Sequence, residues 1–110
     1  MAMQTQYAAT EPTRTEVDAL PGPIIVEFGA PWCPYCQALQ PHLADALRAF
    51  PDVQHIKIED GKGRPLGRSF RVKLWPNLVF LRDGRVVQQS ARPSPAEVRE
   101  GLEAIARAGP

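Results

Sequence analysis

The chain has 110 residues, of which 44% are hydrophobic and 23% charged, and its formal net charge is +1 at pH 7. This length fits one domain with a single core, and the near-zero charge gives no reason to expect a nucleic acid or an anionic membrane as partner. No apolar run approaches the roughly 20 residues of a membrane-spanning helix, and the first residues lack the basic start and apolar stretch of a signal peptide. We therefore expect a monomeric cytoplasmic domain over residues 1–110, with frayed ends at 1–9 and 107–110.

The first predicted elements are a short helix and a buried strand. The polar lead fits either a frayed segment or a short edge strand around Tyr7. A helix is predicted from Thr10-Glu11-Pro12 to about Leu20, where Pro21-Gly22-Pro23 ends it. Residues 24–28 are too uniformly apolar for an exposed strand and predict a central strand that is covered on both faces.

The only two cysteines, Cys33 and Cys36, follow this strand directly and precede a helical pattern. That order places Cys33 at a helix N-terminus, where unpaired N–H groups and the helix dipole favour a thiolate, the reactive form of cysteine. Cys36 comes one turn later on the same helix face, so its sulfur can reach the first. In a reducing compartment a pair this close is catalytic or metal-binding rather than structural. The spacing predicts a redox-active dithiol.

The rest of the chain alternates helices and strands. In order, the pattern predicts a helix over 33–50 kinked at Pro41, a strand over 53–58, a short helix entered at Pro65, a hairpin of 78–81 and 85–88, and a last helix opened by the capping box Ser94-Pro95-Ala96-Glu97. The loop over 61–67 lacks the glycine spacing of a nucleotide-binding loop, so we reject phosphate binding there. Gly101 is expected to weaken the last helix by about 1 kcal/mol relative to alanine.

Two segments carry a resemblance to a known family. Residues 26–36, VEFGAPWCPYC, followed by Pro41, resemble the active-site segment of thioredoxins. Residues 75–80, WPNLVF, with the turn Asp83-Gly84, resemble the cis-proline strand of the same family and the hairpin after it. The resemblance covers most of residues 24–106. It implies an α/β thioredoxin fold, with a central mixed sheet of four to five strands and helices on both faces.

The resemblance also implies a reaction. Cys33 would be the nucleophile that forms a mixed disulfide with a substrate protein, and Cys36 would resolve it, so the protein would be a protein-disulfide oxidoreductase in cell redox homeostasis. The redox group would be the Cys33–Cys36 dithiol/disulfide, with no bound cofactor and no metal. The implied partners are proteins with disulfides and a recharging reductase, either thioredoxin reductase or a glutathione system.

Further residues around the cysteines receive roles from the resemblance. Substrate-binding roles are implied for Trp32, Pro34, Tyr35, Trp75, Pro76 in the cis form, and Arg92. A cis Trp75–Pro76 bond would turn the Trp75 main chain toward an extended substrate segment that pairs as an added strand. Arg92 stands where thioredoxins have a glycine beside the active-site surface, and its charge would favour the Cys33 thiolate and acidic partners.

Glu27 interrupts the apolar strand and stands where thioredoxins usually carry an aspartate. It either points to solvent at a strand end or is buried behind the cysteines, where burial would raise its pKa and suit it as proton acceptor for Cys36. His55 and Lys57 share one face of the next strand, and the sequence does not decide which of them partners Glu27. In the buried case, Glu27→Ala is expected to slow disulfide exchange between about pH 6 and 8.

Two other functions compete with a thioredoxin-type reductase. The sequence Cys-Pro-Tyr-Cys is typical of glutaredoxins and favours a glutathione-coupled enzyme, whereas Trp32, the long region before the central strand and the last helix disfavour it. A non-enzymatic zinc module would use Cys33, Cys36, His42 and His55. Their spacing matches no zinc-finger pattern.

Overall fold

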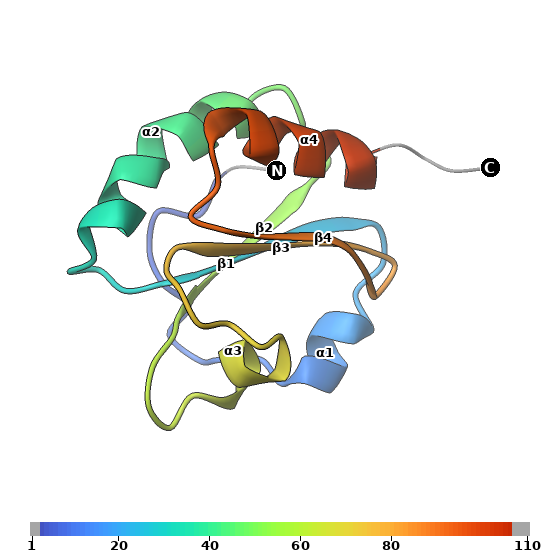
Figure 1. The fold of residues 1–110 in the computed structure, drawn as a ribbon. Helices are drawn as coiled ribbons and strands as arrows, with labels where there is room; N and C mark the ends of the chain where they lie inside the picture. Colours follow the sequence, from blue (N-terminus) through green and yellow to red (C-terminus); the bar gives the residue numbers. More distant parts are fainter. Residues whose placement is uncertain (1–2, 107–110) are drawn as a thin grey trace.

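The computed structural model describes residues 3–106 (Figure 1). The elements follow in the order α1 (Arg14–Asp18), β1 (Pro23–Gly29), α2 (Pro34–Leu47), β2 (Gln54–Glu59), α3 (Pro65–Ser69), β3 (Asn77–Arg82), β4 (Arg85–Ala91) and α4 (Pro95–Ala106). All the predicted helices and strands are present within residues 3–106 except the short edge strand around Tyr7, which the sequence had left as one of two alternatives. Across residues 3–106, no helix combines the length and hydrophobicity that crossing a bilayer requires.

The first two helices and strand β4 differ in their bounds from the prediction, and β4 continues to Ala91. Helix α1 begins at Arg14, because Thr13 rather than an earlier residue is its N-cap. Thr13 Oγ1 accepts the N–H of Glu16, and the Glu16 carboxylate accepts the N–H of Thr13, so the pair forms a capping box that the prediction missed. Helix α2 ends at Leu47, and in the turns that follow it the N–H groups of Ala49 and Phe50 donate to carbonyls three residues back.

The four strands form one mixed sheet in the order β2-β1-β3-β4. Strand β1 pairs parallel to β2 and antiparallel to β3, and β3 pairs antiparallel to β4. Helices α2 and α4 cover one face of the sheet, and α1 and α3 cover the other (Figure 1). No fifth strand forms within residues 3–106; the lead runs beside β2, where the Ala8 N–H donates to the Lys57 carbonyl at 2.8 Å.

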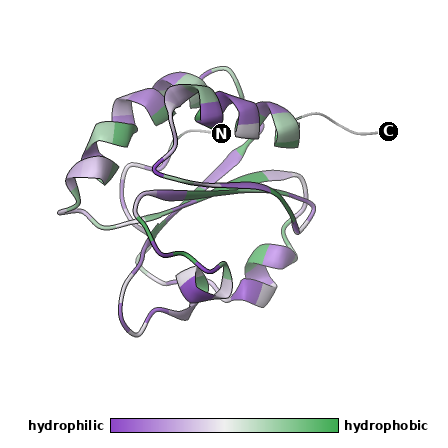
Figure 2. Cartoon of the chain, viewed as in Figure 1, coloured by the Kyte–Doolittle hydropathy of each residue, from purple (hydrophilic) through white to green (hydrophobic). Residues whose placement is uncertain are grey.

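The side chains of β1 alternate between two cores, because successive residues of a strand point to opposite faces. Ile25 packs with Leu39 and Leu43 of α2, whereas Val26 and Phe28 pack in the core under α1 and α3. Figure 2 shows the helices changing between hydrophobic and hydrophilic residues along their length, as amphipathic helices do. This alternation places residue 27 on the same face as Ile25, toward α2.

Gly101 has a packing role that the sequence did not reveal. A Cβ at this position would lie 2.5 to 2.6 Å from three atoms of the Phe80 ring, so α4 can approach β3 only because residue 101 has no side chain. We expect Gly101→Ala to lower the free energy of unfolding by about 1 to 2 kcal/mol, since overpacking outweighs the roughly 1 kcal/mol gain in helix propensity. Urea denaturation measures this, with Glu100→Ala, an exposed change in the same helix, as control. A stabilised Gly101→Ala would contradict the close approach.

Candidate active site

The two cysteines lie where β1 leads into α2. Cys33 is the N-cap of α2, its Sγ accepting the backbone N–H of Cys36 at 3.3 Å. Pro34 occupies the first turn, where a helix needs no N–H donor. Both cysteines are free thiols and buried, with exposed fractions of 4% for Cys33 and 2% for Cys36. The helix therefore presents one sulfur at its N-terminus and holds the other one turn inside.

The environment of Cys36 keeps its thiol protonated. Burial raises the pKa of Cys36 to about 12, and the hydrogen bond to Cys33 and the negative charge of Glu27 act in the same direction. A Cβ on Gly29 would lie 2.6 Å from the Cys36 Sγ, so the glycine leaves room for this sulfur. Cys36 is thus suited to wait as a thiol until another sulfur comes within reach.

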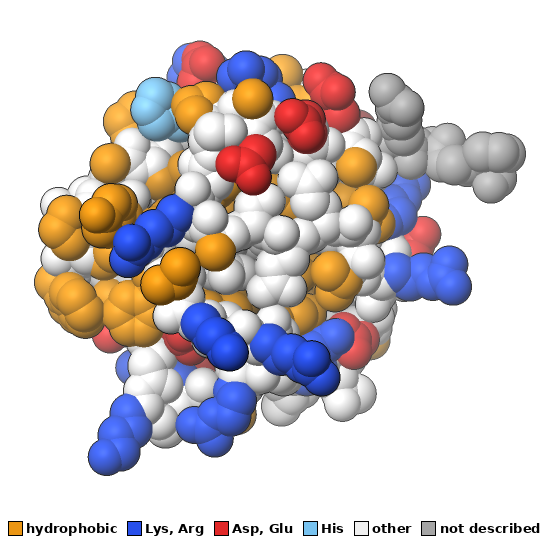
Figure 3. Space-filling view, in the orientation of Figure 1, with side chains coloured by type: hydrophobic (Ala, Val, Ile, Leu, Met, Phe, Trp, Pro, Cys, Tyr) orange, Lys and Arg blue, Asp and Glu red, His pale blue; other side chains and the backbone are white. Residues whose placement is uncertain are grey.

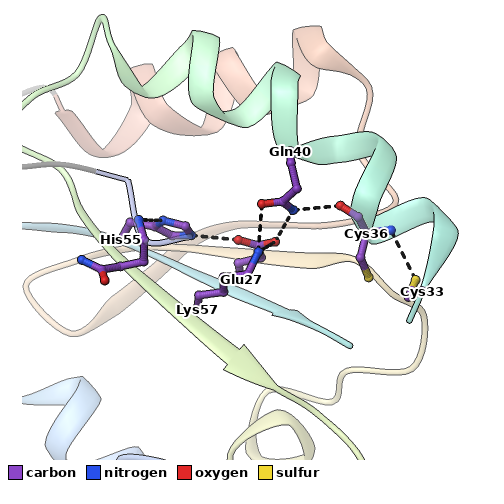
Figure 4. Close-up of polar contacts among 7 residues, drawn as sticks. Glu27, Cys33, Cys36, Gln40, His55 and Lys57 are labelled. Carbon is purple, nitrogen blue, oxygen red and sulfur yellow. Dashed lines mark hydrogen bonds and ion pairs between the residues drawn. The ribbon is translucent and has the colours of Figure 1, made fainter. Parts of the chain in front are cut away.

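Glu27 lies fully buried at the centre of a polar network behind the cysteines (Figure 4). His55 Nε2 lies 2.9 Å from Glu27 Oε1, and Lys57 Nζ lies 3.2 Å from Oε2. Both candidate partners therefore contact the carboxylate, where the sequence had left a choice between them. The register explains this: β1 and β2 pair Glu27 with Lys57, and His55 lies two residues earlier on the same face.

Gln40 joins this network to the cysteine pair, and sequence reasoning missed it. Its side-chain amide donates to Glu27 Oε2 at 2.9 Å and to the Cys36 carbonyl at 2.8 Å, and its own oxygen accepts from Lys57 Nζ at 2.8 Å. The available signal was its spacing: Gln40 follows Cys36 by four residues and so lies on the same helix face.

The pKa of Glu27 was expected to be raised, and that prediction is wrong. Burial by itself would raise the pKa, but the hydrogen bond from His55, the charge of Lys57 and the hydrogen bond from Gln40 outweigh it, and the pKa is lowered. His55 Nδ1 accepts the backbone N–H of Gln4 at 2.9 Å, so the ring proton sits on Nε2 and is donated to Glu27. The network is thus a buried carboxylate that Lys57, His55 and Gln40 hold ionised.

Two tryptophans form a wall beside the cysteines. Trp32 is 69% exposed, and its ring meets that of Trp75 edge to face with 5.6 Å between centroids. The Trp75–Pro76 peptide bond is cis. Trp75 Nε1 donates to Asp60 Oδ2 at 2.8 Å, a contact that the sequence analysis did not anticipate. Asp60 therefore fixes the orientation of the Trp75 ring.

Arg92 lies between Tyr35 and the Trp75–Pro76 segment. Its guanidinium carbon lies 4.0 Å from the centroid of the Tyr35 ring, and its Nε donates to the Trp75 carbonyl at 2.9 Å. The sequence had led us to expect that the charge of Arg92 stabilises the Cys33 thiolate. Within residues 3–106, however, no hydrogen bond joins Arg92 to that sulfur. The Trp75 carbonyl, expected to face a substrate strand, already accepts a side-chain donor.

The candidate zinc ligands are not brought together. His55 is engaged by Glu27 and Gln4, whereas His42 lines a surface pocket with Tyr35 and Arg92. In the part of the chain that the structure describes, no three His, Cys, Asp or Glu side chains are grouped to hold a metal ion.

Comparison with known proteins decides the family. The family model described as Thioredoxin matches residues 4–104, nearly the whole of the described chain. The chain belongs to the thioredoxin family. Thioredoxin 2 from Pseudomonas aeruginosa PAO1, solved in its reduced form, is 53% identical with a TM-score of 0.83, over 94% of this chain and 97% of that one.

Curated relatives of this thioredoxin-family chain are more distant. Mitochondrial thioredoxin-3 of Saccharomyces cerevisiae is 26% identical over 80 residues, and thioredoxin H5 of Arabidopsis thaliana is 28% identical over 79. The matches cover 73% and 72% of this chain, but only 63% and 67% of the relatives. Thioredoxins are thiol–disulfide oxidoreductases whose redox group is the cysteine pair itself, without a further cofactor.

Proposed function

We propose that this chain is a protein-disulfide reductase in cell redox homeostasis that exchanges the Cys33–Cys36 dithiol with disulfides of substrate proteins. The observation that supports this most is the different treatment of the two sulfurs. The sulfur of Cys33 caps α2 and accepts an N–H, whereas burial holds Cys36 as a thiol. This asymmetry suits one sulfur for attack and the other for release.

The reaction proceeds in two exchanges. The Cys33 thiolate attacks one sulfur of the substrate disulfide, the substrate S–S bond breaks, and the leaving thiolate takes a proton from water. Cys36 then loses its proton and attacks the Cys33 sulfur, which breaks the mixed disulfide and releases the second substrate sulfur. Two electrons pass to the substrate, and the Cys33–Cys36 disulfide forms.

The second exchange needs a proton acceptor, because the pKa of Cys36 is raised to about 12. Glu27 is proposed to take this proton transiently, with His55 and Lys57 holding it ionised beforehand. Because its pKa is lowered, it is a weaker base than the sequence had suggested and must pass the proton on. A pocket of about 370 Å³, lined by Cys36, Gln40 and Lys57 among others, has room for the water that would receive it.

The walls of the site are proposed to bind substrate. These walls consist of residues in or next to the first turn of α2 and of residues in the segment that faces it: Trp32, Pro34, Tyr35, Trp75, Pro76 and Arg92. Trp32 and Tyr35 are more than half exposed, so the site offers apolar area next to a buried sulfur. An extended substrate segment could lie along the Trp75 main chain and exclude water from the exchange.

A reductase must return two electrons to the Cys33–Cys36 disulfide after each cycle. Thioredoxin reductase is the expected donor, and the Cys-Pro-Tyr-Cys sequence keeps a glutathione system as the alternative. A reducing cytoplasm stays the predicted setting.

Reduction of insulin disulfides tests the proposal and separates the two donors. We expect NADPH consumption in the presence of insulin and thioredoxin reductase, at a rate that exceeds the rate with glutathione and glutathione reductase. The Cys33→Ser/Cys36→Ser double variant is the control for background. A rate that is faster with glutathione would favour the glutaredoxin-like alternative, and no consumption above background with either donor would refute the proposed reaction.

A further inference from the structure

Arg92 is held in one place by three contacts, although its side chain is exposed. Its backbone has φ of 48°, a left-handed conformation that is unfavourable for a residue with a side chain, and its N–H donates to the Pro76 carbonyl at 2.8 Å. The side chain then stacks on Tyr35 and donates from Nε to the Trp75 carbonyl. A long, flexible side chain is thereby preorganised at the rim of the cysteine site.

These contacts leave the outer edge of the guanidinium free. Arginine has five N–H donors, and the hydrogen bond to Trp75 uses only the one on Nε. Within residues 3–106 no carboxylate forms an ion pair with Arg92. The two terminal amino groups form a planar fork that matches the geometry of a carboxylate.

The protein surface on the other side of Trp75 is also positively charged. Residues 61–73 carry five lysines or arginines and no carboxylate, and four of these cations line a pocket there: Arg64, Arg68, Arg71 and Lys73. The one acidic residue in that pocket, Asp60, is engaged by the Trp75 indole. Figure 3 shows cationic side chains gathered over the part of the molecule where α3 lies, next to the hydrophobic side chains at the edge where α2 begins.

We infer that Arg92 is a specificity residue that binds a carboxylate of the substrate polypeptide, from an aspartate or glutamate close to the disulfide. This inference rests on the proposed function and adds a substrate class to it. Trp75 packs against the cysteine pair and Tyr35 lies in the first turn of α2, so a substrate segment at Cys33 would lie next to the guanidinium that contacts both residues. An acidic side chain at that point gains a charge-assisted, two-pronged bond without the entropy cost of ordering the arginine.

The test uses two synthetic peptides with the same intramolecular disulfide, one with glutamate and one with glutamine beside it. We expect kcat/KM to be about fivefold higher for the glutamate peptide, the size of a good exposed ion pair, and the preference to shrink at 1 M salt. Arg92→Gln should bring the ratio to about one, and Arg92→Lys should keep part of it, because lysine keeps the charge but not the fork.

Controls keep the outcomes distinct. Arg85→Gln removes another exposed charge, at the opposite end of β4, and should leave the ratio unchanged. Arg92→Gly should keep or raise the melting temperature, because the backbone there already adopts a conformation that glycine favours, and should lose the preference. Equal rates for both peptides in the parent protein, or a preference that survives Arg92→Gln, would overturn the inference. Failure to reduce either peptide would refute the proposed function instead.

Discussion

Replacing Glu27 with glutamine is expected to lower the free energy of unfolding by about 3 to 5 kcal/mol, because it leaves the Lys57 ammonium buried without its counter-ion. Glutamine has nearly the same shape, so the loss is electrostatic rather than a cavity effect. Both side chains are buried, Glu27 completely and Lys57 to 5% exposure, so bulk water screens the unpaired ammonium only weakly. Urea denaturation at pH 7 measures the loss.

Two comparison variants show whether the pair is the cause. Glu27→Gln/Lys57→Met removes both charges and should recover most of the stability, since no unpaired charge stays buried. Asp45→Asn breaks an ion pair with Arg48 in which both side chains are more than 70% exposed. It should lower the free energy of unfolding by less than about 1 kcal/mol. If the double variant were as unstable as the single one, the counter-ion explanation would be wrong.

The same substitution should change how stability depends on pH. A carboxyl whose pKa is lowered on folding stabilises the protein fully above its unfolded-state pKa and loses this contribution as the pH falls through its folded-state pKa. The gap between the parent protein and Glu27→Gln should therefore be constant near pH 7 and close below the ordinary value of 4.5. A gap that grows between pH 8 and pH 6 would show that the pKa is raised after all.

Replacing Cys36 with serine is expected to turn the protein into a trap for its substrates. Without the resolving thiol, the mixed disulfide at Cys33 has no internal route of release, so turnover should fall by at least about a thousandfold while a covalent complex approaches one per protein. Non-reducing electrophoresis with an insulin substrate, followed by mass spectrometry of the linked peptides, detects the complex and identifies its bond.

Cys33→Ser is the matched control for this trap. It should lose turnover to the same extent but accumulate no complex, because burial raises the pKa of the remaining thiol of Cys36 and so keeps it protonated at neutral pH. A complex that formed on Cys36 in this variant would reverse the assignment of nucleophile and resolving residue.

Much of the fold could be predicted because its signals are local. The turn at Asp83-Gly84 has positive φ at both residues, as the sequence Asp-Gly between two apolar runs indicates. The capping box at Ser94 and Glu97 forms as predicted, with bonds of 2.9 and 3.1 Å. The prediction was wrong at the start of α1, which it placed at Thr10-Glu11-Pro12 although the N-cap is Thr13. It also missed contacts between residues that are distant in sequence, such as the close approach of Gly101 to Phe80.

The sequence by itself determined where the two sulfurs go, because a strand, a Cys-x-x-Cys pair and a helix in succession leave Cys33 only one position, the cap of α2. Only the tertiary structure decided what surrounds them. Glu27 meets His55, Lys57 and Gln40, which lie 28, 30 and 13 residues away in the chain, through strand register and helix packing. The sign of a buried group's pKa shift depends on the balance between desolvation and such partners, and no local pattern contains that balance.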